Sequence, residues 1–110
     1  MTKIIVKYDK SLCSFIELSG HAGYAKSGYD IVCSGITTAT YTSINLIDTI
    51  NIDCFKIDVN YDAGFLLMDL DYQNLSKEEI EFIQLIIRNL IDMYEEIKRN
   101  YPKYLKIEIL

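Results

Sequence analysis

The stretch SKEEIEFIQLIIRNLIDMYEEI, residues 76–97, decides the fold. Ser76 followed three residues later by Glu79 is a capping box, in which the serine hydroxyl accepts a free amide and the glutamate bonds back to the serine N–H. The pattern predicts a helix through Ile80 to Ile97. Its apolar side chains cover about half of the helix circumference, more than one sheet face requires, so we expect two neighbours. These side chains are Ile80, Phe82, Ile83, Ile86, Ile87, Leu90, Ile91, Met93, Tyr94 and Ile97.

Alternating apolar and polar residues on either side of this helix predict five β-strands. Residues 3–8 and 12–19 form one predicted hairpin, and residues 55–61 and 65–72 form a second. Residues 105–109 alternate again and predict a last strand.

The strand over residues 12–19 is expected to place different residues on its two faces. Its alternation places Leu12, Ser14, Ile16 and Leu18 on one face and Cys13 on the other. In the preceding strand, Ile4, Val6 and Tyr8 are expected to share a face.

Residues 31–50 predict a second helix, although they are rich in β-branched types. The element order is therefore ββαββαβ, joined by hairpins rather than crossovers. This order gives an α+β fold with a largely antiparallel five-stranded sheet and two helices, in a single domain over residues 1–110. The surplus apolar surface of the later helix suggests a homodimer. The residues expected to face the core from 31–50 are Val32, Ile36, Ala39, Ser43, Leu46, Ile47 and Ile50.

Composition restricts the possible function. The 110 residues include 11 Lys and Arg against 16 Asp and Glu, for a formal net charge of −5. Direct binding of nucleic acid is therefore disfavoured, whereas a basic partner suits the acidic chain. No apolar run reaches the roughly 18 residues of a membrane span, and residues 1–8 lack the pattern of a secretory signal. We expect a cytoplasmic protein that does not enter a membrane.

The cysteines Cys13, Cys33 and Cys54 are odd in number and about twenty residues apart, which matches neither a disulfide framework nor paired zinc ligands. We expect free thiols in a reducing compartment. Nothing in the sequence requires a metal or another cofactor.

Polar chemistry is concentrated in GHAGYAKSGYDIVCSG, residues 20–35, which holds four of the five glycines and the single histidine. The connection is longer than the flanking elements need, so we expect a movable flap. Its candidate residues are Gly23, Tyr24, Gly28 and Tyr29.

Asp30 is a good N-cap for the first helix and places Cys33 in the first turn. The positive end of the helix dipole favours a thiolate, which is the nucleophilic form of cysteine. The backbone amides of Cys33 and Ser34 are expected to stabilise the oxyanion that forms when a thiolate attacks a carbonyl.

His21 lies at the end of the second predicted strand and is a candidate general base for Cys33, as in a Cys/His dyad. Two alternatives stay open. In the first alternative, Cys33 is only a small buried residue and His21 is an isolated histidine at the end of a strand. Asp30 is either only a helix cap or a third member that orients His21.

The run Gly20-His21-Ala22, the eleven residues between His21 and Cys33, Gly28, and Asp30-Ile31-Val32-Cys33 together resemble the signature of the ribosomal-processing cysteine protease family, Prp. The resemblance implies a cytoplasmic, dimeric endopeptidase with Cys33 as nucleophile and His21 as base.

The substrate that the resemblance implies is the short N-terminal extension of a basic large-subunit ribosomal protein, L27. The resemblance also implies that such a peptide is hydrophobic and aromatic before the scissile bond, with a small residue and then basic residues after it. The sequence departs from the family pattern at Ser34, where alanine is common, and at Thr37-Thr38, where a serine often stands. We expect these departures to affect the substrate subsites more than the activity.

The alternative function is a non-catalytic acidic binding module that serves as a ribosome-assembly partner. In such a module Cys33 is structural and resists alkylation, whereas an activated thiol reacts first.

Overall fold

The computed structural model describes residues 1–26, 30–60 and 62–110. The predicted order ββαββαβ is confirmed, with one additional 3₁₀ turn between the first helix and the third strand. The elements are β1 (Thr2–Asp9), β2 (Leu12–Ser19), α1 (Ile31–Ile50), the 3₁₀ turn (Ile52–Cys54), β3 (Phe55–Asn60), β4 (Phe65–Leu70), α2 (Lys77–Asn100) and β5 (Leu105–Ile109).

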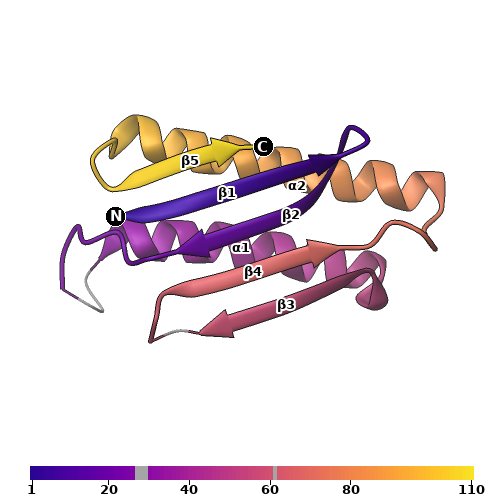
Figure 1. The fold of residues 1–110 in the computed structure, drawn as a ribbon, viewed down its shortest axis with the longest axis horizontal. Coiled ribbons are helices and arrows are strands. Elements are labelled where there is room, and N and C mark those ends of the chain that lie inside the picture. Colours follow the sequence, from indigo (N-terminus) through magenta and orange to yellow (C-terminus); the bar gives the residue numbers. More distant parts are fainter. Residues whose placement is uncertain (27–29, 61) are drawn as a thin grey trace.

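The five strands form one sheet in the order β3-β4-β2-β1-β5, and both helices cover the same face of it (Figure 1). The pairing is antiparallel except between β1 and β5, so the sheet is largely antiparallel, as expected. The β1–β2 hairpin closes through Lys10 and Ser11, whose positive φ values of 51° and 69° match the two-residue turn that suits twisted strands.

The expectation of hairpins without crossovers is wrong. The registers make β2 parallel to β3 and β4 parallel to β5, and α1 and α2 are the connections between these pairs. Each helix therefore returns the chain to the end of the sheet at which the preceding strand began, and the start of α1 lies beside the end of β2 (Figure 1).

The second predicted hairpin is shorter than expected. β4 ends at Leu70 rather than at Tyr72, because its partner β3 begins only at Phe55, after the 3₁₀ turn. One further hydrogen bond continues the pairing, from the Asp71 N–H to the Cys54 carbonyl at 2.7 Å. Tyr61, expected to end β3, lies outside the described residues.

A β-bulge changes the predicted faces of the first hairpin. Lys7 pairs with Phe15 but Tyr8 pairs with Cys13, so the β2 strand carries one extra residue at Ser14. Ile16 faces the core as expected. Beyond the bulge the fully buried Cys13, not Leu12, faces it, and Tyr8 is 44% exposed.

Gln84 of α2 secures the bulge. Its Oε1 accepts the Cys13 N–H at 3.1 Å, and its Nε2 donates to the Tyr72 hydroxyl at 2.6 Å. The Tyr72 hydroxyl in turn donates to the Cys13 carbonyl. The irregular strand thus keeps its backbone groups paired.

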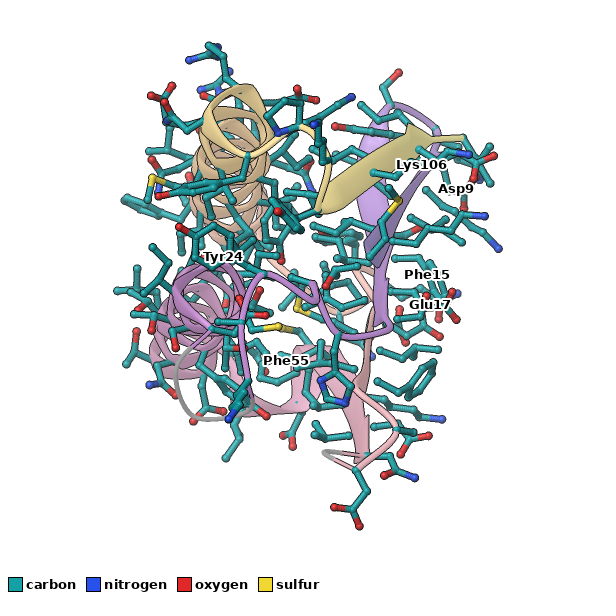
Figure 2. The ribbon with its side chains drawn as sticks, turned by 90° about the vertical axis from the view of Figure 1, so that its left-hand side faces the viewer. Asp9, Phe15, Glu17, Tyr24, Phe55 and Lys106 are labelled. Carbon is teal, nitrogen blue, oxygen red and sulfur yellow. The ribbon has the colours of Figure 1, made fainter. Side chains whose placement is uncertain are left out.

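α2 has the two neighbours that its wide apolar face predicts, because it packs against both α1 and the sheet (Figure 1). The sequence pattern overstated the buried set: Phe82 and Met93 of α2 are 60% and 45% exposed, and Leu46 of α1 is 49% exposed. In α1 the buried positions include Thr40 and Ile44, which the apolar pattern missed. Figure 2 shows that Phe15 and Glu17 point away from the helices, on the open face of the sheet.

A buried hydrogen bond joins the two helices. The Thr40 hydroxyl donates to the Ile36 carbonyl at 2.7 Å, so the Tyr94 hydroxyl, 2.6 Å from Thr40 Oγ1, is the donor of the bond between the helices. Both side chains are fully buried. Within the described chain, no helix is long and apolar enough to cross a bilayer.

We expect Tyr94→Phe to lower the free energy of unfolding by about 1 kcal/mol, because it removes one buried hydrogen bond without opening a cavity. Thr40→Val should cost more, since it leaves the Tyr94 hydroxyl buried without an acceptor. Urea unfolding of both single variants and the double variant measures the coupling. Strictly additive losses would show that the bond contributes nothing.

Candidate active site

Three segments meet at one end of the sheet: the residues after β2, the first turn of α1 and the turn between β3 and β4 (Figure 1). The first two belong to residues 20–35, where the sequence concentrates its polar chemistry. The third segment contains Asp62 and Gly64. From the sequence, Asp62 is expected to belong to a solvated acidic face or to receive basic peptide.

Asp30 is the N-cap of α1 and is 93% buried, with 7% of its surface exposed. One carboxylate oxygen accepts the Cys33 N–H and the other accepts the Tyr24 N–H, both at 3.0 Å. Burial alone would raise the pKa of Asp30, but these and further hydrogen bonds outweigh it, so the pKa lies below its ordinary value. Asp30 therefore ties the segment after β2 to the start of α1.

The half-buried Cys33 thiol lies where Asp30 places it, in the first turn of α1. Its sulfur accepts the Ala22 N–H at 3.1 Å. A backbone N–H directed at the sulfur and the positive end of the helix both stabilise negative charge there.

The two amides expected to bind an oxyanion are already occupied. The Cys33 N–H donates to the Asp30 carboxylate, and the Ser34 N–H donates to the Asp30 carbonyl at 3.0 Å. Helix capping uses the same N–H groups that an oxyanion would need. The oxyanion role expected of Cys33 and Ser34 therefore stays a prediction, and it would require these N–H groups to leave the cap.

His21 is exposed, and its Nε2 lies 3.4 Å from the carbonyl oxygen of Asp62 in the β3–β4 turn. Among the hydrogen bonds of the described residues, none joins His21 to Cys33. The Asp30 carboxylate likewise bonds to backbone groups of Cys33 and Tyr24 and not to the imidazole. The cap role of Asp30 is present, whereas its expected contact with His21 is absent from the described residues.

His21 and Cys33 nevertheless open into the same cavity, which has a volume of about 140 Å³. A second, more open hollow also borders His21 and Cys33 and is lined by polar residues that include Ser34, Thr37 and Thr38. His21, Cys33 and Thr37 line both hollows, so the two adjoin each other beside the thiol. The apolar lining of the cavity comes from Leu18, Ile36, Val59, Phe65 and Leu66.

Of the expected flap residues, Gly23 and Tyr24 are described, whereas Gly28 and Tyr29 lie outside the described residues. The Tyr24 ring packs edge-on against Tyr101 and Tyr104, with ring centroids 5.3 and 5.2 Å apart. Both tyrosines belong to the connection between α2 and β5, so this part of the flap rests on the far end of the chain (Figure 2). No local sequence pattern marks this contact.

The other two thiols differ from Cys33 in their surroundings. Cys13 and Cys54 are buried, and burial raises the pKa of both. In the parts of the chain that the structure describes, no three His, Cys, Asp or Glu side chains are grouped to hold a metal ion. Cys33 is the free thiol that borders both hollows.

Comparison with known proteins gives consistent matches over most of the chain. The model of the family described as "Cysteine protease Prp" matches residues 1–106. The "Ribosomal processing cysteine protease Prp" of Bacillus subtilis (strain 168) is 30% identical over 100 residues, covering 91% of this chain and 88% of the relative. The protein of that name from Staphylococcus aureus (strain Mu50 / ATCC 700699) is 26% identical over 110 residues, covering 97% and 96%.

Solved structures share the fold. The essential ribosomal processing protease Prp from S. aureus, in complex with a covalently linked product peptide, superposes with a TM-score of 0.86 at 21% identity, with complete coverage of both chains. SMU.848 from Streptococcus mutans superposes with a TM-score of 0.83 at 23% identity, covering 100% of this chain and 94% of that one.

Replacement of the cap carboxylate should make stability depend on pH in a defined direction. Because the pKa of Asp30 is lowered by folding, its stabilisation is present above the ordinary carboxyl range and is lost as the pH falls below about 4. At pH 7, Asp30→Asn should lower the free energy of unfolding by about 1–2 kcal/mol.

Denaturant unfolding at pH 7 and near pH 3 measures this difference. The difference in the free energy of unfolding between wild type and Asp30→Asn should be smaller near pH 3 than at pH 7. Asp92→Asn, an exposed carboxylate of α2, is the control and should change stability by less than about 0.5 kcal/mol. A gap that stays constant between the two pH values would contradict a stabilising ionised Asp30.

Proposed function

The chain belongs to the cysteine protease Prp family, and from that premise we propose that it is the endopeptidase that removes the N-terminal extension of the large-subunit ribosomal protein L27. Cys33 is the nucleophile and His21 is the general base in this proposal. The observation that carries it is the placement of a half-buried thiol and the single imidazole on one apolar cavity.

The reaction is acyl transfer in two steps. His21 takes the thiol proton, and the Cys33 sulfur attacks the scissile carbonyl carbon to form a tetrahedral intermediate. The imidazolium then protonates the leaving amine, and water hydrolyses the thioester with His21 again as base. The Ala22 N–H, which bonds to the sulfur in the resting enzyme, is the donor that we assign to the oxyanion.

The cavity and the charge support the substrate class. A cavity of about 150 Å³ lined by aliphatic and aromatic side chains is large enough for a benzene ring, and the cavity beside Cys33 is about 140 Å³. It suits the aromatic residue before the scissile bond. Asp58 and Asp62 line a surface hollow next to the site, and the net charge is −5, which suits basic residues after that bond.

The segment from Ala22 to Tyr29 acts as a flap in this proposal. Three contacts hold its described part: Ala22 to the sulfur, the Tyr24 N–H to Asp30, and the Tyr24 ring to two tyrosines. A substrate that enters must displace or rearrange these contacts, which disfavours unrelated peptides.

The alternative, a non-catalytic binding module on the assembling ribosome, rests on the missing hydrogen bond between His21 and Cys33. Catalytic hydrogen bonds are often long or unformed before substrate binds. A structural Cys33 would be buried like Cys13 and Cys54, and it is half-exposed. The cleavage experiment separates the two functions.

We place the protein in the cytoplasm, where its substrate is made and where free thiols persist. We also propose a homodimer, for which exposed apolar side chains on one face of α2 supply the contact. Phe82, Leu85 and Met93 are 60%, 52% and 45% exposed.

Cleavage of a peptide that spans the L27 extension, followed by mass spectrometry, tests the function. Wild type should cut at one bond. Cys33→Ala should lower kcat/KM by at least about 10⁴-fold, because it removes the proposed nucleophile, and His21→Ala should do so by about 10²–10⁴-fold.

Cys13→Ala provides the matched control, since it removes a buried thiol away from the site. Full activity of Cys33→Ala would end the protease proposal. Intact peptide that nevertheless binds wild type would favour the binding module.

Light scattering after size-exclusion chromatography tests the dimer. The expected mass is twice 12.7 kDa. Phe82→Glu with Met93→Glu should give the monomer, because charge on the apolar face opposes its burial. A single 12.7 kDa species for wild type at all concentrations would contradict the dimer.

A further inference from the structure

His21 is held from the side of the β3–β4 turn. The Asp62 carbonyl oxygen lies 3.4 Å from His21 Nε2. The next amide, the Ala63 N–H, donates to Asn60 Oδ1 at 3.1 Å. The Asp62 carbonyl and the Ala63 N–H belong to one planar trans peptide and point in opposite directions. The Asn60 side chain therefore fixes the direction of the carbonyl that faces the imidazole.

Gly64 forms the second part of this support. Its φ is +61°, a conformation that favours glycine. A Cβ at this position would stand 3.0 Å from His21 Cε1 and 3.1 Å from Nε2, closer than nine in ten real Cβ contacts. The bare Cα thus leaves the space that the ring occupies.

The carboxylate nearest in sequence does not orient the ring. Both oxygens of Asp30 accept backbone N–H groups, from Cys33 and from Tyr24. A cysteine–histidine pair needs a group that fixes the ring orientation and the tautomer, because only the unprotonated nitrogen accepts the thiol proton. The peptide carbonyl of Asp62 is placed to do this.

We propose that the β3–β4 turn positions the catalytic base: Asn60 orients the Asp62–Ala63 peptide, and the Asp62 carbonyl accepts the Nε2–H of His21. The Nδ1 lone pair is then the acceptor of the Cys33 thiol proton. After the transfer the ring carries a proton on each nitrogen, and the proton on Nε2 still donates to the carbonyl. The inference rests on the proposed Cys33 and His21 pair, and Asn60 is a positioning residue in it.

Asn60 is well suited to a test, because its side chain is exposed at the end of an edge strand. Asn60→Ala removes the acceptor of the Ala63 N–H. We expect kcat on the peptide to fall at least about tenfold with little change in KM, since misplacement of a catalytic group by about 1 Å costs up to 10²-fold. Asn60→Asp keeps an acceptor oxygen and should restore most of kcat.

Lys56→Ala is the matched control, because Lys56 is exposed on the same face of β3, four register positions from Asn60. It should leave kcat and KM unchanged. A rise in KM alone for Asn60→Ala would mean that Asn60 only contacts substrate, and would overturn the positioning role. Equal activity of Asn60→Ala and wild type would overturn it as well.

A second measurement needs no substrate. His21 is the single histidine of the chain, so a long-range ¹H–¹⁵N spectrum of the imidazole reports its tautomer without assignment. At about pH 8.5, above the ordinary titration of imidazole, wild type and Asn60→Asp should show one tautomer, with hydrogen on Nε2. Asn60→Ala should show averaging between tautomers. The same spectrum for wild type and Asn60→Ala, or hydrogen on Nδ1 in wild type, would contradict the proposal.

Gly64→Ala places a methyl group against the His21 ring and should also lower kcat. If this variant does not fold, Asn60→Ala still tests the proposal. The proposed chemistry of Cys33 and His21 and the positioning role of Asn60 can be contradicted independently. Retained cleavage by His21→Ala removes the proposed chemistry, whereas loss in His21→Ala without any effect of Asn60→Ala on kcat or tautomer removes only the positioning role.

Discussion

One buried carboxylate joins the segment after β2 to the helix that carries the thiol. The Asp30 carboxylate accepts backbone N–H groups from both elements, including Cys33 in the helix and Tyr24 in the segment. A buried charge must keep its hydrogen bonds, because each unpaired oxygen would carry the full cost of desolvation. The start of α1 and the position of the segment are therefore set together. Since the segment also brings the Ala22 N–H to the sulfur, the surroundings of Cys33 follow from the same carboxylate.

Local rules account for most of the fold. The capping box at Ser76 and Glu79 forms as the sequence predicts, because both partners lie within one helical turn and need no tertiary contact. Strand alternation and the cap at Asp30 are equally local, so the element order and the first turn of α1 could be derived without coordinates. The candidate site residues His21 and Cys33 could be chosen for the same reason, as the single histidine and the cysteine that follows a helix cap.

Pairwise and long-range effects account for the rest. The bulge at Ser14 moves Cys13 to the core, and it depends on Gln84, which is 71 residues away. The sequence pattern did not show that the cap that places Cys33 also takes its N–H, the same group that we expected to bind the oxyanion. The role of Asp62 beside His21 was hidden because a backbone carbonyl leaves no mark on the side-chain sequence.

A peptide carbonyl has a consequence for the proposed chemistry that a carboxylate would not have. It carries no net charge and does not titrate, so it accepts a hydrogen bond from Nε2 before and after the ring gains its second proton. Its orientation depends on the peptide plane, which Asn60 holds through the Ala63 N–H. The oxygens of Asp30 remain bonded to the Cys33 N–H in the helix cap and to the Tyr24 N–H in the segment after β2. Different segments therefore position the two proposed catalytic groups. The first turn of α1 places the Cys33 thiol, and the β3–β4 turn places the His21 imidazole.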